Sequence, residues 1–315
     1  MRKFIFNLLV FVVLMVLLAF AMNRNYFPTK AMGSDGYIGA MVDKHTYAEK
    51  MKSPRIIFVG GANVAFGIDS KAIAAATGLP VVNMGLNASF GLDFMLNEAK
   101  AIARPKDIII ISPEYFLSVD GDYKFKKEAE RMYPPAGKYF NHTPSQFLHD
   151  FFIDDLQHNF FITFSNLTGH PTRKFPTNVV YSRTSFNENG DVVRNFDPHP
   201  SHEFLKKVVI DYQKNLDIAP LNSFKEFADT HHIKTYFLYP CLDEQIYKSR
   251  IKVIEAIHRD FKKEMKIELL NTPEDSVFPD SLFYDTEYHL TLKGKQLRGE
   301  KIIRLLKGKM IIASN

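Results

Sequence analysis

An acid–histidine pair near the C-terminus is the clearest sign of chemistry in this sequence of 315 residues. Asp285 and His289 stand in the segment 285–290 (DTEYHL), directly before the last expected helix. A carboxylate near a histidine can fix the imidazole tautomer and stabilise the imidazolium that forms during proton transfer. Both residues are therefore candidate catalytic residues. The alternative interpretation is a surface loop in which Asp285 caps the helix.

A pair of glycines, Gly60 and Gly61, follows the first expected strand and leads into Ala62 and Asn63. Two glycines permit a tight turn with close approach of another backbone. The pattern matches neither G-x-G-x-x-G nor G-x-x-x-x-G-K-[ST], so it does not indicate a nucleotide site. By itself it predicts a plain strand-to-helix turn or a phosphate-binding loop.

A second turn of small residues, 83–91 (NMGLNASFG), follows the second expected strand. Around Gly85 the backbone can expose N–H groups, and Asn87 adds a side-chain amide. Donors of this kind stabilise the oxyanion that develops in acyl transfer. The alternative is a turn whose glycines serve geometry alone.

Glu114 follows the third expected strand within the segment 112–115 (SPEY). A carboxylate at a strand end can serve as a general base. A buried polar partner or a helix cap is an equally good interpretation of the same residue.

These candidates are positioned by strands that alternate with helices. Continuous apolar strands separated by helices indicate a parallel sheet covered on both faces, so we expect a three-layer α/β/α sandwich with about five parallel strands. Sites in such sheets form outside the carboxyl ends of the strands, where the candidate segments should meet. The expected strands are 55–59, 81–84, 107–112, 234–239 and 266–270, and the main helices are 70–77, 92–103, 221–231, 247–263 and 292–306.

The alternation breaks over residues 116–193, which are rich in aromatic residues and proline. We interpret this stretch as an inserted subdomain with helices near 123–131 and 145–163. The segment 186–193, with Asn-Gly at its centre, predicts a β-hairpin. A further helix is expected at 201–216.

The N-terminus predicts export. Residues 1–22 carry two basic residues followed by an apolar run, long enough for a transmembrane anchor, although a cleaved signal is the alternative. The basic flank places the N-terminus in the cytoplasm and the remainder outside, as a single-pass protein of the cell membrane. Residues 23–53 are expected to be a juxtamembrane linker, and residues 54–315 the α/β domain.

Composition excludes several classes of function. A net charge of +5 without a basic run between aromatics does not indicate nucleic-acid binding. The single cysteine, Cys241, offers no multi-cysteine metal site. The histidines at 199–202 and 231–232 lack further ligands at metal-binding spacing. We therefore expect no metal and no cofactor.

Taken together, segments 59–69, 83–91 and 285–290 resemble the SGNH/GDSL hydrolase superfamily. The first of them, VGGANVAFGID, closely resembles a form of that family in which serine follows the two glycines. The resemblance covers most of the exported part outside the insertion. It implies that Ala62 occupies the place of the nucleophile and that Asp285 and His289 complete a catalytic triad.

The resemblance also implies an oxyanion hole, and here the chain departs from the family pattern. The segment 112–115 (SPEY) stands where the family often has G-x-N, and Asp285 and His289 are one residue further apart than in D-x-x-H. Asn63 or Asn87 is expected to replace the missing asparagine donor. The candidate oxyanion- or substrate-binding residues are Gly61, Asn63, Gly85, Asn87 and Glu114.

Alanine at position 62 is the main departure, because a methyl group can neither attack a carbonyl nor hold an acyl group. Either the chain is a natural non-catalytic relative, or alanine was introduced in place of serine to block turnover. The retained Asp285, His289 and oxyanion segment favour the second explanation.

The resemblance implies O-acyl transfer, with acetylation of an extracytoplasmic polysaccharide as the leading function. The membrane-anchored bacterial proteins that this chain resembles act in polysaccharide O-acetylation or teichoic-acid D-alanylation. Because acyl donors such as acetyl-CoA are made in the cytoplasm, transfer outside requires a multi-spanning membrane O-acyltransferase as partner. The alternatives are a carbohydrate esterase that uses the same residues, and a non-catalytic polymer-binding or scaffolding subunit.

Overall fold

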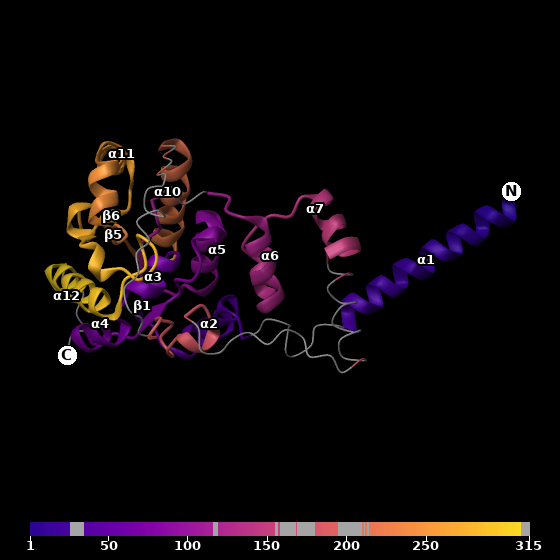
Figure 1. Cartoon of the computed structure of the whole chain (residues 1–315), viewed down its shortest axis with the longest axis horizontal. Coiled ribbons are helices and arrows are strands. Elements are labelled where there is room, and N and C mark those ends of the chain that lie inside the picture. Colours follow the sequence, from indigo (N-terminus) through magenta and orange to yellow (C-terminus); the bar gives the residue numbers. More distant parts are fainter. Residues whose placement is uncertain are drawn as a thin grey trace. The chain divides into compact units, whose positions relative to one another are not determined.

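The computed structural model describes residues 1–25, 35–115, 119–154, 157, 168, 180–194, 210, 212 and 214–309. The chain forms two compact units (Figure 1). The smaller comprises Met1–Ser34 and Asn141–Pro176, and the larger comprises Asp35–Phe140 and Thr177–Asn315.

The smaller unit contains helix α1 (Arg2–Asn25), helix α7 (Pro144–His149) and the π-helical turn η4 (Asp150–Asp154). Among the residues that the structure describes, no helix is long and apolar enough to cross a membrane. The anchor at 1–22 and the localisation stay predictions from the sequence. The expected helix 145–163 is seen only through residue 154, and most of its second half lies outside the described residues.

A parallel five-stranded sheet forms the centre of the larger unit, in the order β2-β1-β3-β4-β6. This agrees with the expected sheet of about five strands. The register pairs Ile57 of β1 with Val82 of β2 and with Ile109 of β3. The strands are β1 (Ile56–Val59), β2 (Val81–Asn83), β3 (Ile108–Ile111), β4 (Lys234–Phe237) and β6 (Glu268–Leu269), while β5 (Leu242–Asp243) pairs with β7 (Val277–Phe278) in a separate two-stranded sheet.

Helices cover both faces of this sheet because successive strand residues point to opposite sides. Ile57 and Ile109 belong to the core under α2 (Ala40–Lys50), α5 (Gly91–Ile102), α10 (Lys214–Thr230) and α11 (Glu244–Glu264). Ile56 and Ile110 belong to the core under α3 (Ala62–Gly67), α4 (Ser70–Thr77) and α12 (Leu292–Gly308). The remaining elements of this unit are α6 (Tyr123–Met132) and the 3₁₀ turns η1 (Tyr37–Gly39), η2 (Ala88–Phe90), η3 (Pro134–Lys138), η5 (Arg183–Ser185), η6 (Glu274–Ser276) and η7 (Asp280–Leu282).

Part of the expected linker and part of the expected insertion are packed into the larger unit. Residues 37–50, assigned to the linker, form η1 and α2, and Met41 and Ala48 are fully buried in the sheet's core. Residues 180–193 of the expected insertion, together with Arg194, also belong to the larger unit and are called here the 180–194 segment. The expected helix 201–216 lies largely outside the described residues, which resume continuously with α10.

The 180–194 segment is fastened to the sheet by buried polar contacts. Its expected hairpin is reduced to a single antiparallel bridge between Phe186 and Val192. The carboxylate of Asp191 accepts hydrogen bonds from the Ser70 hydroxyl at 2.6 Å and from the Asn83 amide at 2.8 Å. These contacts fix the segment beside the carboxyl end of β2.

Two buried lysines add to this attachment. Lys44 of α2 donates to the carbonyl of Gly190 at 2.6 Å, and Lys295 of α12 donates to the carbonyl of Val192 at 2.6 Å. Gly190 has a φ of +93° and no room for a side chain, since a Cβ would lie 2.2 Å from the carbonyl oxygen of Asn83. Only glycine fits this close approach.

Candidate active site

The acid–histidine loop brings its two candidate residues into direct contact. The backbone N–H of Tyr284 donates to the carbonyl of His289 at 2.7 Å, and this bond closes the loop. Asp285 Oδ1 then lies 2.8 Å from His289 Nδ1. Burial acts to raise the pKa of Asp285, but the hydrogen bond and charge of His289 outweigh it and leave that pKa below its ordinary value. The pair is therefore arranged as a carboxylate that orients an imidazole.

Tyr181, in the 180–194 segment, completes this pair. Its hydroxyl donates to Asp285 Oδ2 and lies 3.1 Å from His289 Nδ1. Burial and then the Asp285 carboxylate raise the pKa of Tyr181 above its usual range, so the hydroxyl remains a donor. The sequence analysis missed this residue, because nothing in its local pattern links it to a loop about a hundred residues away.

The imidazole of His289 lies against the helix that begins at Ala62. Its ring stacks on Phe66 of α3, with centroids 4.2 Å apart and planes inclined by 9°. Phe66 is four residues after Ala62, so both lie on one face of α3. Within the described part of the chain, Nε2 of His289 has no hydrogen-bond partner. The nitrogen that a nucleophile at position 62 would need is thus unoccupied.

Glu114 lies over the turn that contains Ala62. Its carboxylate accepts from the backbone N–H of Gly61 at 3.2 Å and from that of Asn63 at 2.8 Å. A Cβ on Gly61 would lie 2.5 Å from both carboxylate oxygens, so this contact requires glycine. Burial raises the pKa of Glu114, against the lowering effect of its bonds with Asn63. Glu114 therefore organises the turn and takes up two of its N–H groups.

Asn63 does not face the site. Its side-chain amide donates to the carbonyl of Ser112 at 2.8 Å, and its Oδ1 accepts from Arg298 at 3.2 Å. The residue is fully buried. Its amide is already used in joining α3 to β3 and α12, so it is not arranged to replace the missing asparagine donor.

Gly85 and Asn87 occupy different roles in the second turn. The N–H of Gly85 donates to Asn83 Oδ1 at 2.9 Å, and a Cβ there would lie 2.5 Å from that of Val64. Gly85 therefore allows close packing against α3 and offers no spare donor. Asn87 caps η2 through Oδ1, which accepts from the N–H of Ser89 at 2.9 Å. Among the described residues no group pairs with its Nδ2, so Asn87 retains an amide donor.

Tyr37, from the segment assigned to a linker, is a second residue that sequence reasoning missed. Its hydroxyl is buried and has no hydrogen-bond partner in the described part of the chain. Burial, and then the charges of Glu114 and Asp285, raise its pKa. Its ring packs edge-on against that of Tyr181, with centroids 5.6 Å apart. Tyr37 thus adjoins the candidate site through its contact with Tyr181.

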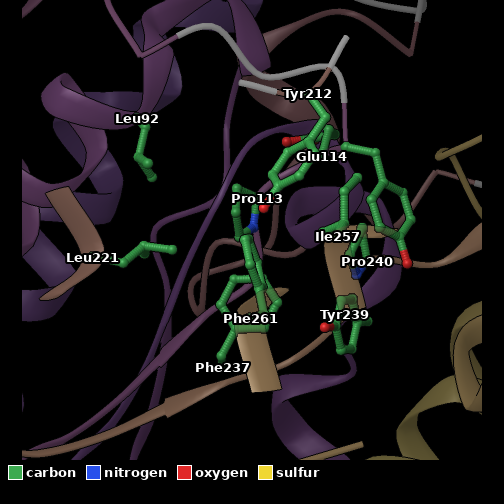
Figure 2. Close-up of a pocket in the computed structure, with 11 residues that line it drawn as sticks. Leu92, Pro113, Glu114, Tyr212, Leu221, Phe237, Tyr239, Pro240, Ile257 and Phe261 are labelled. Atoms are coloured by element: carbon green, nitrogen blue, oxygen red, sulfur yellow. The ribbon is translucent and has the colours of Figure 1, made fainter. Parts of the chain in front are cut away.

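A small apolar cavity of about 40 Å³ adjoins Glu114 at the carboxyl ends of β3 and β4 (Figure 2). This is room for about one water molecule. Glu114 therefore contacts the 61–63 turn through its carboxylate and also lines the cavity. The cavity wall further includes Pro113, Leu221, Phe237, Tyr239 and Phe261.

One group of residues could in principle hold a metal in the smaller unit. His149, Asp150 and Asp154 have ligand atoms within 4.8 Å of one another. His149 Nδ1 lies 3.7 Å from Asp154 Oδ2, which an ordinary ion pair explains. We assign no metal to it.

Comparison with known proteins gave matches among solved structures. No family model and no curated protein sequence matches the chain. A solved structure of a protein assigned to the G-D-S-L lipolytic family, from Desulfitobacterium hafniense DCB-2, is similar over 81% of this chain and 100% of that one, with 12% identity and a TM-score of 0.38.

Proposed function

We propose that the larger unit is an acyl-transfer domain of the SGNH/GDSL type, complete except for the nucleophile at position 62. The observation that carries this proposal is the Asp285–His289 pair, whose imidazole lies along α3, the helix that begins at Ala62. Asp285 and Tyr181 both engage Nδ1, which leaves Nε2 as the proton-accepting atom.

In the active form, a serine at position 62 attacks the acyl carbonyl and its hydroxyl proton passes to His289 Nε2. The C–O bond of the tetrahedral intermediate then breaks, and the leaving group takes that proton. Asp285 stabilises the imidazolium between these steps. A second acceptor, a polymer hydroxyl or water, repeats the sequence on the acyl-enzyme.

The oxyanion is held by the donors that the fold leaves unpaired. The N–H groups of Gly61 and Asn63 bind Glu114, and that of Gly85 binds Asn83. The N–H of residue 62 and the Nδ2 amide of Asn87 are two donors of these turns without a partner among the described residues. We assign the oxyanion hole to these two donors.

The acceptor we propose is an extracytoplasmic polysaccharide, and the acyl group an acetyl group. Support comes from the sequence of residues 1–22, which would hold the domain at the outer face of a membrane, beside a multi-spanning acyltransferase that delivers the acyl group. A carbohydrate esterase would use the same residues with water as acceptor.

Alanine at position 62 specifically favours a second candidate, a non-catalytic subunit that binds the polymer. In that function the Asp285–His289 pair and Tyr181 would recognise the glycan without acyl transfer.

Reconstitution of the nucleophile tests the proposal. Ala62→Ser is expected to confer hydrolysis of p-nitrophenyl acetate, while the present chain and an Ala62→Gly control remain at the background rate. Added glycan acceptor should divert the acetyl group from water if the domain is a transferase. A folded Ala62→Ser protein that neither releases nitrophenol nor forms an acetyl-enzyme would contradict catalysis and leave the binding subunit.

A further inference from the structure

A second and larger cavity, of about 330 Å³, lies at the carboxyl ends of β4 and β6, beside α12. This volume falls within the usual range of small-molecule sites. One wall is α12, which contributes Arg298, Lys301 and Arg304, and the other wall includes Asn271, Asp275 and Ser276. The proposed acyl-transfer reaction uses none of these side chains.

The α12 wall is strongly cationic. Its three basic residues recur at intervals of three, and all of them line the cavity. Burial lowers the pKa of Lys301, Asp275 opposes this effect, and the charge of Arg304 adds to it. Two neighbouring cations therefore repel each other here, and an anion between them would relieve that repulsion.

Arg298 is a buried cation without a hydrogen-bonded carboxylate. The side chain is 2% exposed. Its guanidinium donates to the carbonyl oxygen of Asn63 at 2.9 Å and to Ser112 Oγ at 3.2 Å, both neutral acceptors. Its Nε has no partner among the described residues. A buried charge is costly without a counter-ion, and among the described residues the hydrogen-bond partners of this guanidinium include no carboxylate.

The opposite wall supplies little to balance this charge. Both polar atoms of the Asn271 side chain already have hydrogen-bond partners: Oδ1 accepts from the N–H of Tyr239 at 2.9 Å, and Nδ2 donates to Ser276 Oγ at 2.6 Å. Asp275 is the single carboxylate lining the cavity, and its Oδ2 accepts from the N–H of Thr272 at 2.8 Å. Three cations thus face one acid that already has a partner.

We propose that this cavity is a binding site for a small phosphate-type dianion. Lys301 is half-buried and donates to the backbone carbonyl of Asp275 at 2.7 Å. Its remaining ammonium hydrogens and the exposed Arg304 can receive two phosphate oxygens, with Arg298 supplying positive charge from the buried side of α12. Because Arg298 also holds Asn63, the occupied site would stiffen the join between α12 and the 61–63 turn.

Phosphate binding by the full-length chain tests this site. Inorganic phosphate is titrated into the protein by calorimetry at low ionic strength, and vesicles with phosphatidic acid are offered in a separate sedimentation assay. The double variant Lys301→Gln/Arg304→Gln removes two cations from the cavity. Lys293→Gln/Lys307→Gln removes two exposed cations from the same helix, neither of which lines it.

Saturable binding of phosphate is expected, weakened about tenfold or more by the cavity variant and less than about twofold by the control. Absence of saturable binding would overturn the proposal. Equal weakening by both variants would do so as well, since it would indicate attraction to net charge only. Binding to vesicles without binding of free phosphate would also overturn it, because the site would then be a lipid surface.

Discussion

The described residues of the larger unit include two carboxylate–histidine pairs, and their settings differ. His45 of α2 bonds Glu98 of α5 through Nε2 at 2.9 Å, and His289 bonds Asp285 through Nδ1 at 2.8 Å. Both imidazoles stack on an aromatic ring at 4.2 Å, that of His45 on Tyr133. Geometry of the pair alone therefore does not distinguish a structural contact from a catalytic one.

The surroundings do distinguish them. His45 and Glu98 are 1% and 5% exposed and join two helices that cover the sheet. The other pair lies in a loop near the carboxyl ends of the strands, where Tyr181 and Tyr37 approach it and Nε2 of His289 stays unpaired among the described groups. A carboxylate–histidine pair becomes a candidate catalytic site when the imidazole nitrogen that is not bonded to the carboxylate is free to accept a proton from a nucleophile.

The largest effect expected from this contrast is on activity. In an Ala62→Ser background, His289→Ala should reduce kcat/KM for an acetyl ester by about a thousandfold or more, because triad members act as a unit. His45→Ala in the same background should retain most of the activity. Steady-state kinetics on both double variants provides the measurement. Comparable losses from the two substitutions would show that the contrast is incorrect.

The reverse pattern is expected for stability. His45→Ala leaves the carboxylate of Glu98 buried without its partner and should lower the free energy of unfolding by about 1–3 kcal/mol. His289→Ala should cost less, because Asp285 keeps the hydrogen bond from the Tyr181 hydroxyl. Urea unfolding followed by circular dichroism compares the two variants. A smaller loss for His45→Ala than for His289→Ala would argue that the His45–Glu98 pair is not a structural contact.

The attachment of the 180–194 segment, which carries Tyr181, can be tested through the pH dependence of the free energy of unfolding. Burial, partly offset by Asp191, lowers the pKa of Lys44 to about 7. The unfolded chain, with an ordinary lysine, binds a proton more tightly. Protonation of Lys44 therefore favours the unfolded state at pH values below 10.5, the pKa of this lysine in the unfolded chain. The free energy of unfolding should rise with pH from about 7 towards 10.5.

Only one proton is involved, so the free energy of unfolding can rise by at most about 1.4 kcal/mol per pH unit. Lys44→Met should flatten the profile of unfolding free energy between pH 7 and 9. Lys71→Met removes an exposed lysine near Glu188 and should leave the slope unchanged. An unaltered slope in Lys44→Met would mean that Lys44 titrates normally in the folded protein.

The sequence predicted the parts of this molecule that depend on local pattern. Helix α4 matches its expected range, 70–77, because its cap at Asp69 and its stop at Gly78 are both local signals. The strands are apolar runs bounded by turns, and Asp285 and His289 are close enough in sequence for one loop to join them.

What the sequence did not predict depends on contacts between distant residues. The direction of the Asn63 amide is set by Ser112 and by Arg298, which lies 235 positions away. Tyr181 meets Asp285 across 104 positions. A tyrosine in an aromatic-rich stretch carries no local sign of such a contact, so only the folded chain reveals it.

The smallest expected effect concerns Tyr181 itself, and it tests whether this residue acts on the pair or only fills space. Tyr181→Phe in the Ala62→Ser background keeps the ring that packs on Tyr37 but removes the hydroxyl. A hydrogen bond to a carboxylate contributes about 1.5–3 kcal/mol, so kcat/KM should fall about tenfold or more.

The hydroxyl also helps to lower the pKa of Asp285, so its removal should raise that pKa and shift the acid limb of the kcat/KM profile to higher pH. Tyr284→Phe, a neighbouring tyrosine without a catalytic assignment, is the matched control. An unchanged kcat/KM with an unchanged pH profile would assign Tyr181 to packing. A shifted acid limb in Tyr181→Phe alone would establish that the Tyr181 hydroxyl lowers the pKa of the carboxylate in the Asp285–His289 pair. Among the described residues, no such hydroxyl is hydrogen-bonded to the His45–Glu98 pair.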